Sequence, residues 1–386
     1  MSLTVVHSFP VWLPQTQTWL YHQVRFLPDE VTSHIVCKET RHLDQFQLPN
    51  LHSLSGPSSR LSDFGTRLLR HLDYHLFVRR MCGKLVPDIL HSHFGPVGWK
   101  NYRVMRPLAS GCIANIKQVV TFYGQDVDYL PRINPAWNRR YRDMFGRADL
   151  VLCEGPFMAG KVEALGCSSD LIRVHHLGVD LGTITYNPRK KRDDEPFRIL
   201  MAAAFRPKKG LLYGLKALEN VASRFDFKIT LVGDATGDAE SVREKKRILE
   251  FLATSPLAGR VEMTGFLSAE QLMGIAGNHH IYLAPSVTAD NGDSEGGAPV
   301  SLIEMAASGM PAISSRHCDI PGVIRDGESG LLADERDVDG IAACLEKLMS
   351  QPESWIGMTD NARRHIETHF DAEKQGFSLY KLYEMI

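Results

Sequence analysis

The sequence predicts an α/β fold made of two doubly wound, Rossmann-like domains. Short runs of β-branched and aromatic residues alternate with longer helical segments, which is typical of parallel sheets covered by helices on both faces. A length of 386 residues is long for one domain and sufficient for two, each with its own core. A charged segment flanked by prolines, residues 187–196, interrupts the alternation and predicts the linker.

The first domain is expected over residues 1–186. Its strands are short apolar runs, and the segments between them have apolar residues at helical spacing. The expected strands are Leu3–His7, His34–Cys37, Asp88–Ser92, Gln118–Phe122, Leu150–Cys153 and Ile172–His176. Helices are expected near residues 15–26, 62–85, 98–109, 135–147 and 156–166.

The second domain is expected over residues 197–370, on the same alternation. Its strands are expected at Phe197–Ala203, Phe227–Gly233, Arg260–Gly265, Ile281–Ser286 and Pro311–Ser315. Its helices are expected at 210–224, 238–253, 268–277, 299–308, 337–350 and 354–369, followed by a final segment, 371–386. Ligands of such domains bind beyond the carboxyl ends of the strands, so we expect the two domains to face a cleft.

The bulk composition excludes several classes of protein. The net charge is −1, divided into +5 over residues 1–180 and −6 over residues 181–386, which suggests an anionic partner for the first half and no nucleic acid. Seven dispersed cysteines indicate reduced thiols rather than a disulfide framework or a zinc site. We expect no signal peptide and no membrane-spanning segment, hence a cytoplasmic protein that is soluble or peripheral at the inner face of the membrane.

The most informative segment is the loop and helix that follow the apolar run at Ile281. Two glycines open the backbone, and Pro299 stands where a first helical residue is expected. The unpaired amides and positive end of such a helix suit a phosphate. Glu304, one turn further, can hold a ribose diol, and Glu295 can bind sugar hydroxyls. The segment predicts a nucleotide-sugar site that includes Gly296, Gly297, Ala298, Pro299 and Val300.

Polar side chains also stand at the strand ends of the first domain. His91 and His93 lie on one face of their expected strand, and His93 is nearest the loop. Asp126 follows the next strand, after Tyr123 and a glycine. A histidine at a strand end is often a hydrogen-bonded core residue, and an aspartate there can be a helix cap. The convergence of the strand ends favours site roles for His93 and Asp126, either orienting the donor sugar or taking the acceptor proton.

These motifs resemble the donor signature of retaining glycosyltransferases with the GT-B fold, in particular family 4. That signature has a glutamate, a glycine, a small residue, proline and valine, then a second glutamate; here eight residues separate Glu295 from Glu304, one more than usual. The resemblance implies that Lys209 neutralises the departing diphosphate and that Gly233 brings backbone near the nucleotide. Ala204 stands where the family has arginine, so Arg206 is the expected substitute, while Lys208 is interpreted as a solvated charge at a helix start.

The same resemblance implies a metal-independent hexosyltransferase with no cofactor, in which Glu295 contacts the reacting sugar. The donor would be a UDP-, GDP- or ADP-sugar, and the last helix would cross back onto the first domain. Asp126 and Asp128 form an Asp-x-Asp pair that could hold a metal against a diphosphate, but cations and the helix dipole are preferred.

The acceptor is expected to be a glycan or a lipid-linked glycan of cell-surface, exopolysaccharide or glycolipid biosynthesis. Basic residues in the segment 62–86 and at Arg139–Arg142 could form a face for anionic lipid, although such a helix is usually packed on the core. Two alternatives stay open: a phosphorylase or hydrolase on the same fold, and a catalytically silent sugar-binding protein. A dehydrogenase is disfavoured, because no Gly-x-Gly-x-x-Gly follows either opening strand.

Overall fold

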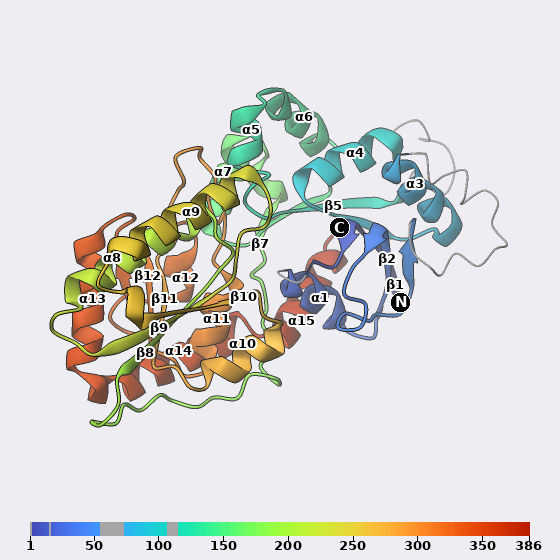
Figure 1. The fold of residues 1–386 in the computed structure, drawn as a ribbon. Coiled ribbons are helices and arrows are strands. Elements are labelled where there is room, and N and C mark those ends of the chain that lie inside the picture. Colours follow the sequence, from blue (N-terminus) through green and yellow to red (C-terminus); the bar gives the residue numbers. More distant parts are fainter. Residues whose placement is uncertain (1, 15–16, 55–72, 106–114) are drawn as a thin grey trace. The chain divides into compact units, whose positions relative to one another are not determined.

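The computed structural model describes residues 2–14, 17–54, 73–105 and 115–386. The chain divides into two compact units, one of Met1–Gly178 with Ala372–Ile386 and one of Val179–Asp371 (Figure 1). Each unit has its own parallel sheet and its own hydrophobic core. The predicted α/β class with two Rossmann-like domains is therefore confirmed.

The first unit is built on a seven-stranded sheet in the order β3-β2-β1-β4-β5-β6-β7, with every neighbouring pair parallel. The strands are β1 (Leu3–Trp12), β2 (Val31–Thr40), β3 (Leu51–Ser53), β4 (Ile89–His93), β5 (Lys117–Phe122), β6 (Leu150–Cys153) and β7 (Ile172–Val174). The helices are α1 (Thr18–Arg25), α3 (Tyr74–Leu85), α4 (Gly95–Met105), α5 (Tyr129–Ile133), α6 (Ala136–Phe145), α7 (Pro156–Ala164) and α15 (Ala372–Glu384).

The second unit has a six-stranded parallel sheet in the order β10-β9-β8-β11-β12-β13. Its strands are β8 (Phe197–Ala202), β9 (Phe227–Val232), β10 (Val261–Gly265), β11 (Ile281–Ala284), β12 (Ala312–Ser315) and β13 (Leu331–Ala333). Its helices are α8 (Leu211–Val221), α9 (Ala239–Thr254), α10 (Ala269–Ala276), α11 (Val300–Ala307), α12 (Ile320–Val323), α13 (Val338–Ser350) and α14 (Trp355–His369), with a 3₁₀ turn at Pro207–Lys209.

The expected elements are present, with three kinds of difference. β1 and β2 extend to ten residues each, because they pair in register as far as Trp12 with Thr40. The short elements β3, β13, α5 and α12 were not predicted, since three to five residues carry too little periodicity. Parts of two expected helices, residues 62–72 and 106–109, lie outside the described residues.

The boundary between the units falls earlier than the expected linker at 187–196. The chain leaves the first unit after Gly178. The start of the expected linker is bound to the second unit instead, because Asn187 N and Arg189 N donate to the carbonyls of Ser308 and Gly309, each at 3.0 Å. The guanidinium of Arg189 is also buried there, donating to backbone carbonyls that include the one of Ser308.

The return of the last helix to the first unit is confirmed. Leu379 and Tyr383 of α15 are almost fully buried in the core that also contains Val5 of β1 and Val119 of β5. The Tyr383 hydroxyl lies 2.6 Å from Nδ1 of His91 on β4. Hydrophobic burial and one buried hydrogen bond thus fix the end of the chain to the sheet where it began.

Candidate functional site

The carboxyl ends of β8 and β11 and the start of α11 surround a small cavity in the second unit. Its lining includes Ala203, Lys209, Ser286, Pro299 and Ser301. The cavity has a volume of about 10 Å³, room for about one water molecule. The strand ends, the 3₁₀ turn and the start of α11 that the sequence placed at a donor site are therefore neighbours in the structure.

Glu295 and Lys209 form a nearly buried ion pair at this site. Lys209 Nζ lies 2.7 Å from Glu295 Oε2, and the two side chains are 20% and 6% exposed. The other carboxylate oxygen accepts a hydrogen bond from Ser286 Oγ at 2.7 Å. Burial alone would raise the pKa of Glu295, but the ammonium groups of Lys209 and Lys208 outweigh it, and the pKa falls to about 2. Glu295 is a fixed carboxylate at neutral pH.

The start of α11 has the polarity required for an anion. Pro299 is the residue before the helix, one position earlier than expected, and its carbonyl accepts from Leu302 N at 3.0 Å. The amides of Val300 and Ser301 begin the helix and so have no intrahelical acceptor. Gly296, at φ +79°, adopts a backbone conformation that favours glycine, which accounts for a glycine directly after Glu295.

Glu304 lies one turn further along α11 and is partly buried. Within the described residues its carboxyl group has no hydrogen-bonding partner. Burial raises the pKa of Glu304 to about 7. Two uncommitted oxygens beside a helix N-terminus form an arrangement that can receive a diol.

Arg206 is not part of the Lys209–Glu295 pair. Its guanidinium lies 2.7 Å from Asp238 Oδ2 and donates to Thr236 Oγ1 at 3.1 Å, near the start of α9. Hydrogen bonds to that carboxylate, from Thr236 Oγ1 first, hold the pKa of Asp238 at about 2, and the charge of Arg206 adds to them. Arg206 and Lys209, which were expected to act together on the diphosphate, therefore have different partners in this structure.

The interpretation of Lys208 as a solvated charge is wrong. Its side chain is only 12% exposed, and Nζ lies 3.2 Å from Asp293 Oδ1 and 2.8 Å from the carbonyl of Ser294. Lys208 thus ties the 3₁₀ turn to the loop that carries Glu295. The sequence contained one indication of this ion pair, namely Asp293, an acidic residue in a loop that follows a strand.

Gly233 occupies a point where two backbone segments nearly touch. Its φ is +123°, and a Cβ atom there would lie 1.9 Å from the carbonyl oxygen of Ala203. Its amide donates to the carbonyl of Gly265 at 2.8 Å. No side chain fits at this end of β9, because the Ala203 backbone occupies the space that a Cβ atom would need.

In the first unit, His93 is fully buried in a chain of hydrogen bonds. The Tyr123 hydroxyl donates to Gln23 Oε1 at 3.0 Å and lies 2.6 Å from His93 Nδ1, so His93 Nδ1–H must donate to it. His93 Nε2 lies 3.2 Å from His7 Nδ1 and accepts from it. Burial lowers the pKa of His93 well below its usual range. Both ring nitrogens of a neutral imidazole are therefore engaged.

Asp126 binds two backbone amides. Its carboxylate accepts from Gly95 N at 2.8 Å, at the start of α4, and from Tyr123 N at 3.0 Å. Burial raises the pKa of Asp126 to about 6 in spite of these bonds. Asp128 pairs with Lys161 at 3.1 Å, so the two carboxylates of the Asp-x-Asp pair have separate partners.

Three histidines of the first unit, His7, His91 and His93, lie with ring nitrogens within 4.8 Å of one another, all fully buried. Sequence reasoning did not single out His7, which pairs in register with His91 on the neighbouring strand. Both nitrogens of His91 have hydroxyl partners at 2.6 Å, Tyr383 and Thr121. His7 Nε2 has no partner among the described residues. The cluster is a buried polar network whose imidazoles are held mainly by each other and by hydroxyls.

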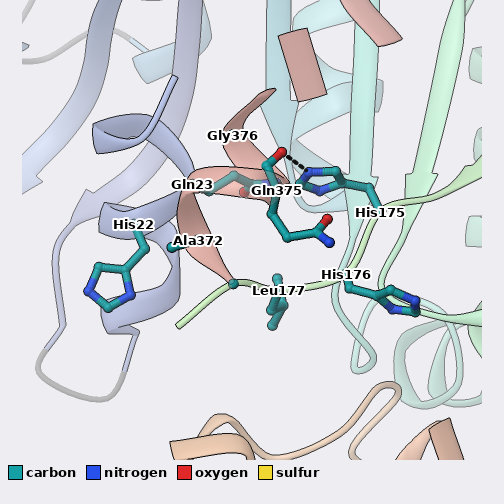
Figure 2. Close-up of a pocket in the computed structure, with 9 residues that line it drawn as sticks. His22, Gln23, His175, His176, Leu177, Ala372, Gln375 and Gly376 are labelled. Atoms are coloured by element: carbon teal, nitrogen blue, oxygen red, sulfur yellow. Dashed lines mark hydrogen bonds between the residues drawn. The ribbon is translucent and has the colours of Figure 1, made fainter. Parts of the chain in front are cut away.

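A second small cavity of the first unit adjoins this network. Figure 2 shows its lining, which includes His22 and Gln23 of α1, His175, Leu177 and residues at the start of α15. His175 Nε2 donates to the carbonyl of Gln375 at 3.0 Å, and Nδ1 lies 3.4 Å from Gln23 Nε2. Burial lowers the pKa of His175 to about 4. The hydrogen-bond chain from His7 thus reaches the point where α15 begins.

The surface expected to meet anionic lipid is only partly described. The apolar side of α3 is packed in the core of the first unit through Phe77, Val78 and Met81, while Lys84 is exposed. The helix therefore presents charge rather than an apolar face. In the described part of the chain, no helix is both long enough and apolar enough to cross a bilayer.

Two doubly wound parallel units, with the last helix returned to the first, define the GT-B class of glycosyltransferases. Residues 16–183 match the model of Glycosyltransferase Family 4, and residues 184–365 match that of Glycosyl transferases group 1. The chain belongs to the glycosyltransferase family that these two models together describe.

Its relatives include enzymes named for polysaccharide synthesis. The amylovoran biosynthesis glycosyltransferase AmsK of Erwinia amylovora is 31% identical over 74% of this chain and 67% of its own. A proposed colanic acid biosynthesis glycosyltransferase, WcaL of Salmonella typhimurium, is 27% identical over 88% of this chain and 79% of its own. Among solved structures, HepE of Anabaena in complex with UDP and glucose matches 100% of both chains with a TM-score of 0.77 at 15% identity.

Proposed function

We propose that this glycosyltransferase moves a hexosyl group from a nucleoside-diphosphate sugar to an acceptor hydroxyl, with retention of configuration at the anomeric carbon. The observation that carries the proposal is the arrangement along α11. Glu304 has uncommitted carboxyl oxygens, one turn beyond amides that lack intrahelical acceptors, and Pro299 at the helix start lines the same cavity as Lys209.

In this proposal the donor is held by charge and backbone rather than by a metal ion. Glu304 binds the ribose hydroxyls, and the amides at the start of α11 bind the diphosphate. Cleaving the sugar–phosphate bond places negative charge on the diphosphate, which Lys209 and the helix N-terminus stabilise by several kcal/mol in total. Arg206 is the second cation, paired with Asp238 until the diphosphate competes for it.

Glu295 contacts the sugar in the proposed complex. Its carboxylate is ionised at neutral pH and already accepts one hydroxyl hydrogen bond, from Ser286, so it can accept others from the hydroxyls of a hexose. When the diphosphate draws Lys209 away, a lone pair of Glu295 becomes available beside the reacting carbon.

For the first unit we propose an acceptor-binding role in which His93 and Asp126 shape the strand ends. Asp126 fixes the loop after β5 to the start of α4, and His93 joins that loop to β1 through Tyr123 and His7. Both residues are engaged by neighbours, which supports orienting the donor sugar or acceptor over abstracting a proton.

The substrate class follows from the relatives. Two of them are named for the synthesis of the exopolysaccharides amylovoran and colanic acid, and HepE was solved with UDP-glucose. We propose a UDP-sugar as the first donor to test, ahead of GDP- and ADP-sugars, and a growing or lipid-linked exopolysaccharide as the acceptor. Contact with the cytoplasmic face of an anionic membrane would bring the enzyme to such an acceptor.

The proposal is tested by incubating the purified protein with a panel of nucleotide sugars and recording melting temperature, nucleotide release and the anomeric proton signal of the product. Transfer with the donor's anomeric configuration supports it, and inversion contradicts the retaining mechanism. Sugar release that is independent of acceptor indicates a hydrolase, and binding without turnover indicates a silent sugar-binding protein. Glu304→Gln is the control, because it removes one acceptor oxygen while keeping the size of the side chain.

A further inference from the structure

The loop between β11 and α11 carries Glu295, yet few of its own backbone groups hold it in place. Two internal backbone hydrogen bonds close the middle of the loop, from Ala289 N to the carbonyl of Asp293 and from Gly292 N to the carbonyl of Ala289, each at 2.8 Å. A carboxylate on a loop reaches a substrate reproducibly only when the loop itself is fixed. The groups that fix this loop therefore determine where Glu295 lies.

The backbone amide of Glu295 is bound by a side chain from the segment that follows β12. Glu295 N donates to Nε2 of His317 at 3.1 Å. His317 follows β12, is fully buried, and also has the Cys318 thiol 3.1 Å from the same nitrogen. Because a backbone N–H can only donate, Nε2 carries no proton and the proton of the neutral ring is on Nδ1.

That proton is directed at a carboxylate which holds the other end of the loop. His317 Nδ1 lies 2.7 Å from Glu335 Oε1 and donates to it. Glu335 Oε2 accepts from Thr288 N at 2.7 Å, and Oε1 lies 3.3 Å from the Thr288 hydroxyl. One imidazole–carboxylate pair thus joins the beginning of the loop, Thr288, to the residue that carries the functional carboxylate, Glu295.

We propose that His317 and Glu335 are positioning residues, which clamp the loop so that the Glu295 carboxylate is held against the donor sugar. The proposal rests on the proposed function only for the consequence in catalysis, since the clamp itself is a property of the loop. Neither residue was singled out by the sequence, where each stands outside the motifs of the donor site.

Two substitutions at one position separate the halves of the clamp. In His317→Gln the side-chain amide lies near the place of Nε2, so its oxygen can still accept from Glu295 N. In His317→Asn the amide lies near the place of Nδ1, so it keeps the bond to Glu335 and releases Glu295. If His317 contributed only its volume or its polarity to the interior, the two variants would behave alike.

The first readout needs no substrate. Hydrogen–deuterium exchange of the full chain should show the Glu295 amide exchanging at least about tenfold faster in His317→Asn and within about threefold of wild type in His317→Gln. Equal exchange in both variants would overturn the clamp. Melting temperatures show whether each variant is folded. If His317→Asn is not, Glu335→Gln serves instead and should accelerate exchange at Thr288; unchanged exchange there would also overturn the proposal.

The second readout is kinetic. With a donor that the wild type uses, His317→Asn should lower kcat by about tenfold or more and leave the donor KM within about threefold, because the nucleotide contacts on α11 are untouched. His317→Gln should retain most of the wild-type kcat. If the wild type transfers no sugar, the proposed function fails while the exchange result still decides the clamp; if it does transfer and both variants match it, only the clamp fails.

Discussion

Replacing Lys209 by methionine should leave a buried carboxylate without its cation. The pKa of Glu295 is about 2 against an ordinary value of 4.5, and its side chain is only 6% exposed. A difference of about 2.5 pKa units corresponds to about 3 kcal/mol of folding free energy. Lys208 supplies part of that shift, so we expect Lys209→Met to lose about 2 kcal/mol at pH 7.

The sign of the pH dependence distinguishes this explanation from a simple packing loss. A carboxyl whose pKa is lowered by folding stabilises the native state above its unfolded pKa and loses that contribution as the pH falls through the folded value. In the variant, Glu295 takes up a proton at higher pH than in wild type. Because a loss of about 2 kcal/mol corresponds to about 1.5 pKa units, the stability difference between the two proteins should narrow by about 0.8 kcal/mol between pH 7 and pH 3.

The assay is urea denaturation of wild type, Lys209→Met, Glu295→Gln and the double variant at both pH values. The double variant should be more stable than the sum of the single losses implies, with a coupling of about 2 kcal/mol at pH 7. Additive losses within about 0.5 kcal/mol, or a Lys209→Met deficit that is the same at pH 3 and pH 7, would refute the reasoning.

Three further predictions concern single positions. Gly233→Ala should lose at least about 3 kcal/mol in urea denaturation, because its Cβ would meet the Ala203 carbonyl at 1.9 Å; a loss under 1 kcal/mol would show that the backbone can move. Since the pKa of Glu304 is about 7, its ionised fraction rises from about a tenth to about nine tenths between pH 6 and pH 8. Donor affinity by calorimetry should rise up to about tenfold over that range and should be flat in Glu304→Gln. Asp126→Asn places an amide group against one of two backbone N–H donors and should cost about 1–3 kcal/mol of unfolding free energy, a figure that chemical denaturation can check.

Much of the fold could be read from local sequence. β6 lies at Leu150–Cys153 as predicted, because a strand covered on both faces is a continuous apolar run with clear ends. α11 is placed within one residue, since Pro299 and Gly309 mark its limits. The expected linker failed for a tertiary reason: the charge of Arg189 indicates exposure, but its guanidinium finds carbonyl acceptors in the second unit.

The partners of the site residues were beyond the reach of sequence reasoning. Lys209 and Glu295, 86 positions apart, were each expected at the donor site, but nothing local predicted that they pair. Arg206 meets Asp238 because the start of α9 lies beside the 3₁₀ turn. His317 is a lone histidine after a strand, and only the fold shows that it receives the amide of Glu295. Identity of a charged residue is local information, whereas its partner depends on packing.

Hydrogen–deuterium exchange of the full-length protein, with and without UDP, GDP and ADP, tests the central claim most directly. A nucleoside diphosphate bound as proposed should slow exchange at the first amides of α11, residues 300–301, and in the turn at Pro207–Lys209. Glu304→Gln should weaken that protection. Slowed exchange confined to other parts of the chain, or none with any of the three nucleotides at millimolar concentration, would contradict the account.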